Sequence, residues 1–275
     1  MGLRITTNVA SIDAQKNLAV QKRRASHALA ALSSGSRIVT AADDPAGLAI
    51  SENLKGQIHG IRAAKRNASN ATSLVQVSEG GLNEISNILI RLRELGVQAA
   101  SDNIGHKERG FLNVEAQQLL QEADRIAKTT RFGNMKLLDG SGKRLQFQVG
   151  PFAGKNNIIS YHMDADARAS TLGIEGLSVA SKDGARDTLR AVDKGLDKVS
   201  KMRADFGAVQ SRLQATVSNL EIQNENLSAA NSRIRDTNIA SETARLASAN
   251  ILEHAGISVL AQANQSGQEA LRLIG

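Results

Sequence analysis

The sequence predicts a mainly α-helical protein: a long antiparallel helical rod or coiled-coil bundle, a small β-hairpin region near residues 130–180, and a coiled coil of the paired terminal helices. Three observations support this fold class. Apolar residues recur with heptad spacing over long stretches, only 2 of the 275 residues are proline, and only 2% are aromatic. Because proline interrupts helices, its scarcity permits long ones. A core of Leu, Ile, Val and Ala suits helices that interdigitate.

The longest heptad pattern runs from Leu189 to Ile234 in alternating steps of three and four residues. Such a pattern is typical of a coiled coil. The polar side chains that interrupt it are Arg203, Gln210, Asn224 and Asn231. Polar residues at seam positions set register and partner choice at a cost in stability.

Two earlier segments can pack against this helix. The same rhythm runs from Ile58 to Leu82, then resumes at Ile85 after a three-residue slip in phase and continues to Leu92. A further helix is expected over 106–129. Three long helices from one chain can share a core, so we expect a helical rod.

Residues 130–180 have a different character, because glycine recurs through them. Apolar residues alternate in LQFQV (145–149), and NIISYHM (157–163) is rich in β-branched and aromatic residues. This pattern predicts a β-hairpin with its turn near 150–156.

The two chain ends are also predicted to be helical. In residues 4–32 the spacing of four and three falls on Leu18, Lys22, Ala25, Leu29 and Leu32. Near the other end a heptad row comprises Ala249, Leu252, Gly256, Val259, Ala263, Ser266, Ala270 and Leu273, and a second apolar row comprises Leu260, Gly267 and Ile274. A helix that is apolar on so much of its circumference must be buried all round. One chain supplies only the N-terminal helix as cover, so we expect other copies of the chain to supply the rest.

Composition argues against several classes of chemistry. There is no cysteine, and the five histidines are scattered without a metal-ligand spacing such as HExxH. No GxSxG motif occurs and no convergent set of polar residues suggests a hydrolase. No apolar run is long enough to span a membrane, and the N-terminus lacks the apolar core of a secretory signal. We therefore expect no enzyme activity, no catalytic residue, no cofactor or metal, and no membrane insertion.

The net charge of +7 raises the question of an anionic partner. Residues 1–70 carry ten basic and four acidic residues, whereas 236–275 carry two basic and four acidic residues. Binding to nucleic acid normally combines basic residues with stacking aromatics or a recognised motif. The basic N-terminal part contains no Phe, Tyr or Trp, so no nucleic-acid partner is expected. Steeply salt-sensitive binding would identify that alternative class.

The stretch SSGSRIVTAADDPAGLAI (33–50) admits three interpretations: a phosphate loop, a carboxylate metal site, or a joint between two helices. It lacks the GxxxxGK[ST] pattern of a P-loop. Asp43 and Asp44 are adjacent and so point in different directions, and no third carboxylate is close in sequence. A joint fits better, because Gly35 can end one helix while Asp44 caps the next and Pro45 begins it. The metal site remains the weaker alternative.

Several segments together resemble bacterial flagellin, the subunit of the flagellar filament. They are MGLRITTNVASIDAQKNL, SSGSRIVTAADDPAGLAISENLKGQI, GLNEISNILIRLRELGVQAASDN and SRIRDTNIASETARLASANILEHAGISVLAQANQSGQEALRLI. The resemblance covers roughly 1–140 and 170–275, without the surface domains that many flagellins insert in mid-chain, so it implies a short, core-type flagellin. The family usually has proline at the position of Gly267, and Phe-Asn-Gly where this chain has Phe132-Gly133-Asn134. A hook–filament junction protein is a near alternative, although such proteins normally lack the DDPAGLAI and LAQANQ blocks.

The resemblance implies a structural subunit that self-assembles into the flagellar filament for motility. Residues 1–40 and 238–275 are then expected to form a terminal coiled-coil domain lining an inner tube, and 41–237 a helical rod in an outer tube. The expected inner-tube assembly residues are Leu18, Ala25, Leu29, Leu32, Leu252, Val259, Ala263 and Leu273. The expected spoke, or hinge, between the tubes contains Gly35, Arg37, Asp43, Asp44 and Pro45. We expect Arg37, Asp43 and Asp44 to fix its angle.

The resemblance also implies partners and a location. The expected partners are many copies of the chain itself, a flagellar export chaperone, and the cap and hook–filament junction proteins. The protein is expected outside the cell, exported by the flagellar type III route without a cleaved signal peptide. The Toll-like receptor that senses flagellins is a further expected partner. Residues at the family's receptor contacts are Arg91, Leu95, Glu115 and Gln118, while Leu119 stands where arginine is common.

Overall fold

The computed structural model describes residues 7–272, with side chains described as far as residue 265. The chain divides into two compact units. Unit 1 combines Met1–Ile58 with Glu225–Gly275, and unit 2 is His59–Asn224. The two borders therefore fall inside two long helices rather than in loops.

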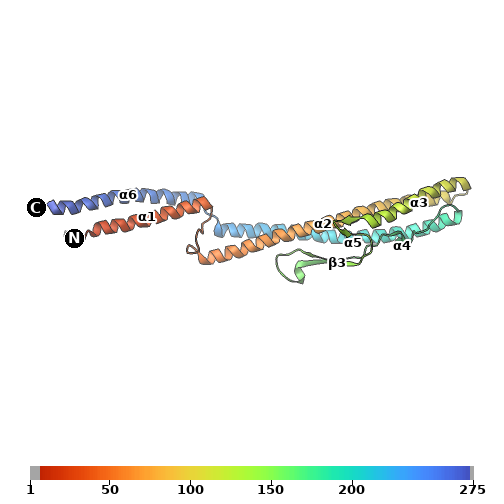
Figure 1. Cartoon of the computed structure of the whole chain (residues 1–275), viewed down its shortest axis with the longest axis horizontal. Helices are drawn as coiled ribbons and strands as arrows, with labels where there is room; N and C mark the ends of the chain where they lie inside the picture. Colours follow the sequence, from red (N-terminus) through yellow and green to blue (C-terminus); the bar gives the residue numbers. More distant parts are fainter. Residues whose placement is uncertain (1–6, 273–275) are drawn as a thin grey trace. The chain divides into compact units, whose positions relative to one another are not determined.

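Helices account for most of the described chain, which confirms the predicted mainly α fold class (Figure 1). They are α1 (Val9–Ser34), α2 (Pro45–Ala99), α3 (His106–Thr129), the short α4 (Ala169–Leu172), α5 (Lys182–Arg235) and α6 (Ile239–Arg272). The strands are β1 (Arg131–Phe132), β2 (Met135–Lys136), β3 (Lys143–Gln148) and β4 (Ile158–Met163), with a 3-10 turn, η1, at Lys155–Asn157. None of the described helices is long and apolar enough to cross a membrane.

Unit 2 contains the main apolar core, formed where α2, α3 and α5 lie side by side (Figure 1). The predicted heptad rows supply its centre. Fully buried members include Val75, Leu82, Ile85, Leu89, Leu92, Val192, Val199, Phe206 and Leu213. The core is rich in branched aliphatic side chains that interdigitate at close-packed density.

Polar residues within the two heptad rows of unit 2 pair with polar residues on the facing helix. Lys65 Nζ lies 2.6 Å from Glu221 Oε1. Arg203 Nη2 lies 3.7 Å from Glu79 Oε1. These exposed or half-exposed pairs are worth little energy individually. Because each requires one alignment of α2 against α5, they favour the observed register.

Helix α3 has the predicted bounds, 106–129, and its predicted inward-facing residue Leu120 is buried, but its most deeply buried residues are alanines. Leu112 and Leu119 are half-buried, whereas Ala116, Ala123 and Ala127 are almost completely buried. Small side chains permit close approach of α3 to the core.

The predicted β-hairpin is present. Strands β3 and β4 pair antiparallel, with Phe147 opposite Ile159 and Leu145 opposite Tyr161. The Tyr161 ring contacts the Phe206 ring of α5, at 5.6 Å between centroids. Burial raises the pKa of the Tyr161 hydroxyl to about 12. Within unit 2, an aromatic contact therefore connects the hairpin to α5.

A second, two-residue pairing of β1 with β2 was not predicted. Its turn contains Gly133, whose φ of 58° is a left-handed conformation that glycine adopts without strain. Strands of two residues are too short to give an alternating pattern in the sequence.

In unit 1, α1 and α6 lie side by side and antiparallel, with the beginning of α2 and the end of α5 nearby in the same unit (Figure 1). The sequence predicts a helix from residue 4. Of the described residues, Thr7 and Asn8 precede it and the helix begins at Val9. The reason is a cap: Asn8 Oδ1 accepts a hydrogen bond from the backbone N–H of Ser11 at 3.1 Å.

Candidate functional site

The seam between α1 and α6 is built mainly from small side chains. On α1 the residues at steps of three and four are all buried or half-buried, namely Ser11, Ala14, Leu18, Gln21, Ala25 and Ala28. On α6 the corresponding residues are Glu242, Leu246, Ala249, Glu253, Gly256, Leu260 and Ala263. A Cβ at Gly256 would stand 3.4 Å from Leu18 Cδ1. Small residues thus bring the two helices close together along one face each.

Hydrogen bonds tie the beginning of α1 to α6. Asn8 Nδ2 donates to the Ala263 carbonyl at 2.8 Å, and the Ser11 hydroxyl lies 2.9 Å from Asn264 Oδ1. Together with the Asn8 cap, these contacts define the antiparallel register at this end of the pair.

The residues expected to drive assembly fall into two groups in the structure. Leu18, Ala25, Leu32 and Ala263 are half-buried, the first two and Ala263 within the seam. Leu29, Leu252 and Val259 are exposed, with exposed fractions of 59%, 46% and 56%. Leu273 lies outside the described residues.

The exposed group belongs to a larger set. Eight of the 18 large apolar side chains that are exposed among the described residues lie on α1 and α6. They are Val9, Ile12, Leu29, Ile239, Ile251, Leu252, Ile257 and Val259. Exposed apolar side chains gathered on one helix pair are typical of an interaction site.

A shallow groove of about 390 Å³ runs between α1 and α6. Its α1 side is formed by Gln21, Arg24 and His27, and its α6 side includes Arg245 and Leu252. The buried Oε1 atom of Gln21 has no hydrogen-bond partner among the described residues. The groove therefore combines polar groups with an apolar side chain.

The second part of the site is the joint between α1 and α2. Helix α1 ends at Gly35, whose φ of 67° is the left-handed conformation that terminates helices. The chain then pairs with the last residue of α5 and the residues after it. Arg37 N–H donates to the Arg235 carbonyl at 2.7 Å, and Thr237 N–H donates to the Gly35 carbonyl at 3.0 Å. Two helix ends from opposite halves of the sequence are thus joined by a short antiparallel bridge.

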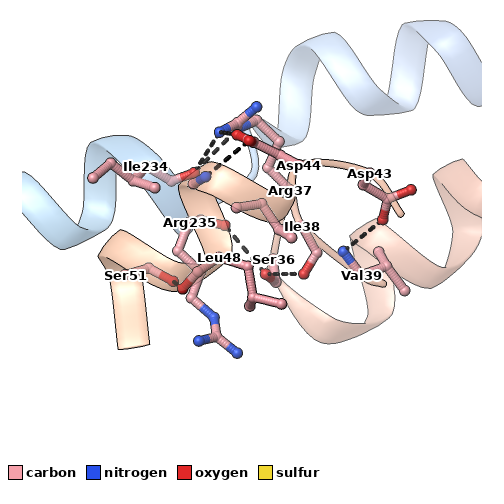
Figure 2. Close-up of polar contacts among 11 residues, drawn as sticks. Ser36, Arg37, Ile38, Val39, Asp43, Asp44, Leu48, Ser51, Ile234 and Arg235 are labelled. Atoms are coloured by element: carbon pink, nitrogen blue, oxygen red, sulfur yellow. Dashed lines mark hydrogen bonds and ion pairs between the residues drawn. The ribbon is translucent and has the colours of Figure 1, made fainter. Parts of the chain in front are cut away.

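The Arg37 side chain links both helices that meet here (Figure 2). Its Nε and Nη2 atoms donate to the Ile234 carbonyl at 3.1 and 2.7 Å, near the end of α5. Nη2 also lies 3.3 Å from Asp44 Oδ2. A cation near the last carbonyls of a helix satisfies free acceptors and the helix dipole. One guanidinium therefore connects the end of α5 to the beginning of α2.

The two aspartates of the joint serve different backbone groups. Asp44 Oδ1 accepts from the Gly47 N–H at 2.8 Å and caps α2, whose first residue is Pro45. A Cβ at Gly47 would lie only 2.2 Å from Asp44 Oδ2, so this capping geometry requires glycine there. The helix-end roles predicted for Gly35, Asp44 and Pro45 are present.

Asp43 instead organises the turn before α2. Its Oδ2 atom accepts from the N–H group of Val39 at 3.0 Å (Figure 2). The same atom accepts from the N–H group of Thr40 at 2.7 Å. Its Oδ1 atom lies 3.1 Å from His27 Nε2 on α1. The Thr40 hydrogen bond, aided by His27 and Val39, lowers the pKa of the Asp43 carboxyl.

Sequence reasoning missed the partners of the joint from distant parts of the chain. Ile234 and Arg235 supply carbonyls, and Arg235 also pairs with Glu52 on α2. Ile38, in the middle of the joint, is buried. In the sequence, the end of the long heptad pattern at Ile234 marks where α5 ends, but it does not indicate which segment meets it.

No group of three or more metal-ligating side chains occurs in the part of the chain that the structure describes. The carboxyl oxygens of Asp43 and Asp44 are occupied by backbone N–H groups, His27 and Arg37. The local geometry is that of a helix joint.

The residues expected to contact an immune receptor lie on α2 and α3. Arg91 forms ion pairs with Glu94 at 2.9 Å and with Glu115 at 2.7 Å. Gln118 is exposed. Leu95 is completely buried in the core of unit 2, so its side chain offers no surface in this structure.

Within unit 1, a helix pair with exposed apolar side chains and a capped joint to the next helix is typical of a structural protein that associates through helices. Comparisons with known proteins specify it further. The model of the bacterial flagellin N-terminal helical region matches residues 5–143, and that of the C-terminal helical region matches residues 189–274. The chain belongs to the bacterial flagellin family. It is accordingly a structural subunit of the extracellular flagellar filament, and it is not an enzyme.

Relatives match over nearly the whole chain. A flagellin of Halalkalibacterium halodurans is 39% identical over 271 residues, which cover 98% of this chain and 99% of that protein. The flagellar filament core protein flaB2 of Brachyspira hyodysenteriae is 40% identical over 282 residues, with 98% and 99% coverage. These proteins lack large additional domains relative to this chain.

Solved structures agree on the fold. The crystal structure of Bacillus cereus flagellin has a TM-score of 0.51 and 28% identity, covering 60% of this chain and 94% of that one. A flagellar hook-associated protein of Vibrio parahaemolyticus has a TM-score of 0.59, covering 70% of this chain and 100% of that one. At 13% identity, the latter likeness concerns the fold alone.

Proposed function

We propose that filament assembly proceeds by burial of the outward faces of α1 and α6 between neighbouring copies. The observation that carries this proposal is the set of eight exposed large apolar side chains on these two helices. Fully burying one such side chain is worth roughly 1.5–3 kcal/mol. A few of them per subunit, repeated along a polymer, supply a substantial driving force for association.

In this proposal, residues 1–40 and 238–275 form the inner tube and residues 41–237 the outer tube. The α1–α6 seam holds each subunit's terminal helices together through Leu18, Ala25 and Ala263, with Leu32 near its end. Leu29, Leu252 and Val259 contact other copies. Leu273 is assigned to the same assembly set from the sequence pattern.

The joint then acts as the spoke between the tubes. Gly35 ends α1, Asp44 and Pro45 begin α2, and Arg37 and Asp43 hold the intervening turn. This role is supported by hydrogen bonds. The ten residues that connect α1 to α2 form hydrogen bonds among themselves, with the beginning of α2 and with the end of α5.

The test of assembly is polymerisation of purified monomer seeded with short filaments and followed by electron microscopy. Leu252→Ser combined with Val259→Ser should leave helix content unchanged in circular dichroism but prevent tube formation. The matched control, Leu252→Met combined with Val259→Ile, keeps apolar surface and should assemble. Normal tubes from the serine variant would contradict the proposal.

We also propose an export route and further partners, and family membership is the support for them. The proposal includes export by the flagellar type III route without a cleaved signal peptide, and contacts with an export chaperone, the cap and the hook–filament junction proteins. A secretion assay in a bacterium lacking the flagellar export gate tests the route. Continued appearance of the chain in the medium would exclude it.

Recognition by the flagellin-sensing Toll-like receptor is proposed to use Arg91, Glu115 and Gln118. Because Leu95 is buried, it contributes only by supporting α2. Arg91→Ala should lower receptor activation, whereas Arg125→Ala, which removes a comparable exposed arginine paired with Glu122, should not. Equal activation by both variants would remove Arg91 from the contact.

A further inference from the structure

Helix α1 carries an unbalanced positive charge. Between Val9 and Ser34 the only acidic residue is Asp13, and the basic residues are Lys16, Lys22, Arg23 and Arg24. All four basic side chains are exposed. Within the described residues, the ion pair that α1 makes is between His27 and Asp43. In the part of the chain whose side chains the structure describes, no carboxylate pairs with these four cations.

These cations share the outward side of α1 with apolar side chains. Ser11, Ala14 and Ala28 are buried on the side that faces α6. Val9, Ile12, Lys16 and Arg23 follow one another at steps of three, four and seven, which places them together on the opposite face. Val9 is 48% exposed and Ile12 is 55% exposed.

Lys22 and Arg24 flank that face, because each adjacent residue is turned by about 100° around a helix. Long basic side chains on the flanks can lay their methylene stems along an apolar surface while their charged ends reach outward. On the outward side of α1, Val9 and Ile12 thus form an apolar beginning, and Lys16 and Arg23 follow as cations. Lys22 and Arg24 lie on either side of this face.

An anionic lipid surface fits this combination better than the other anionic partners. Nucleic acid would call for stacking aromatics, and α1 contains no aromatic residue except His27. Interfacial helices combine an apolar strip with flanking Lys and Arg, and anionic headgroups attract each basic residue near the surface. We propose that α1 docks the unassembled subunit on anionic membrane surfaces through Val9, Ile12, Lys16 and Arg23, with Lys22 and Arg24 at the flanks.

Docking lays the helix along the headgroups and needs no membrane-spanning segment. It also gives a role to Lys16, Lys22, Arg23 and Arg24, whereas Arg37 and Lys65 in the same part of the sequence already pair with carboxylates. Because Val9 and Ile12 are also among the side chains proposed to be buried in the filament, lipid binding belongs to the subunit before polymerisation.

The experiment uses the full-length chain, cleared of polymer by ultracentrifugation and mixed with vesicles of phosphatidylcholine alone or of phosphatidylcholine with phosphatidylglycerol. Co-sedimentation should occur with the phosphatidylglycerol vesicles and decrease as salt is added. Lys16→Glu combined with Arg23→Glu should weaken it about thirtyfold or more. The control, Lys107→Glu combined with Lys201→Glu, makes the same change in net charge at exposed sites in unit 2 and should bind as the wild type does.

Equal binding to both kinds of vesicle would overturn the proposal, as would equal losses in the two double variants. Capture by polyglutamate or duplex DNA without capture by vesicles would overturn it in favour of an acidic protein or a nucleic acid. Circular dichroism confirms that the variants remain helical. Seeded polymerisation of the same samples tests the assembly proposal separately from the lipid proposal. A chain that forms tubes without binding lipid contradicts the lipid proposal but not the assembly proposal.

Discussion

Arg37 and Ile234 are 197 residues apart in the sequence, yet the Arg37 guanidinium donates twice to the Ile234 carbonyl, from Nε at 3.1 Å and from Nη2 at 2.7 Å. The same Nη2 atom reaches Asp44 at the beginning of α2. The joint thus depends on a planar group that serves two partners at once, which the single ammonium of lysine does not reproduce.

Replacing Arg37 tests this geometry. Arg37→Ala should destabilise unit 1 by about 1–2 kcal/mol, because the Ile234 carbonyl and the Asp44 carboxylate lose charge-assisted hydrogen bonds. Arg37→Lys should recover only part of the loss. Hydrogen exchange at the Arg37 and Thr237 amides, both within the bridge, measures the effect. Full recovery by lysine would mean that charge alone matters.

Gly35→Ala tests the left-handed end of α1. No atom lies within 4 Å of a Cβ built at Gly35, so the cost is conformational and should be about 1 kcal/mol. Gly56→Ala is the matched control, since Gly56 lies inside α2 with equally open space. There alanine should stabilise by about 0.5–1 kcal/mol. Thermal unfolding should shift in opposite directions, and a parallel shift would contradict the account.

Substitutions of Asp44 distinguish its role as the cap of α2 from its ion pair with Arg37. Asp44→Asn keeps a side-chain acceptor for the Gly47 N–H and should cost little, whereas Asp44→Ala removes the cap of α2 and should cost about 1 kcal/mol. Urea unfolding of the two variants gives the comparison. If both variants lost the same free energy of unfolding, the stabilisation by Asp44 would come from its contact with Arg37 and not from the cap.

Asp166 gives a pH dependence in unit 2. Its hydrogen bonds with Arg168, and then with Thr171, lower the pKa of its carboxyl from 3.8 to about 2. A lowered folded-state pKa stabilises the protein above the unfolded value, and the stabilisation disappears as pH falls from about 4 to 2. The shift corresponds to about 2 kcal/mol.

Unfolding of the wild type and Asp166→Asn should therefore differ at neutral pH and converge near pH 2. Asp183→Asn is the control, because Asp183 is almost fully exposed and pairs with Arg186 at 3.6 Å. A constant difference across this pH range would exclude protonation of Asp166 as the cause.

The long helices of unit 2 were predictable because packing requires a regular spacing of apolar residues. All heptad positions from Leu189 to Ile234 are buried or half-buried in the structure. The polar residues that interrupt the heptad pattern were also recognisable in the sequence, but the residues with which they pair were not. That Arg203 meets Glu79 depends on the alignment of two helices, which spacing within one helix does not specify.

The terminal pair was only partly predictable. Alanine and glycine contribute little to an apolar pattern, so Leu252 and Val259 seemed to belong to one row with Ala249, Gly256 and Ala263. In the structure the last three are buried or half-buried while the two larger residues are exposed. Close approach of small residues, rather than burial of large ones, determines which face of α6 meets α1.

At the joint, residue types identified the helix ends because capping is local. Gly35, Asp44 and Pro45 act on backbone groups within a few positions of themselves. The Ile234 carbonyl that the Arg37 side chain binds is 197 residues away, and no local pattern encodes such a partner.

The bridge between residues 35–37 and 235–237 also has a consequence for the order of folding. Contacts between residues far apart in the sequence form late, since a long loop must close before they are gained. When the chain emerges with its N-terminus first, residues 35–37 are present long before residues 235–237. The bridge can therefore form only after most of the sequence has emerged. Closure of the joint therefore requires the chain as far as residue 237, because a chain cut short before residue 234 lacks the carbonyls to which Arg37 donates and leaves this side chain only its contact with Asp44.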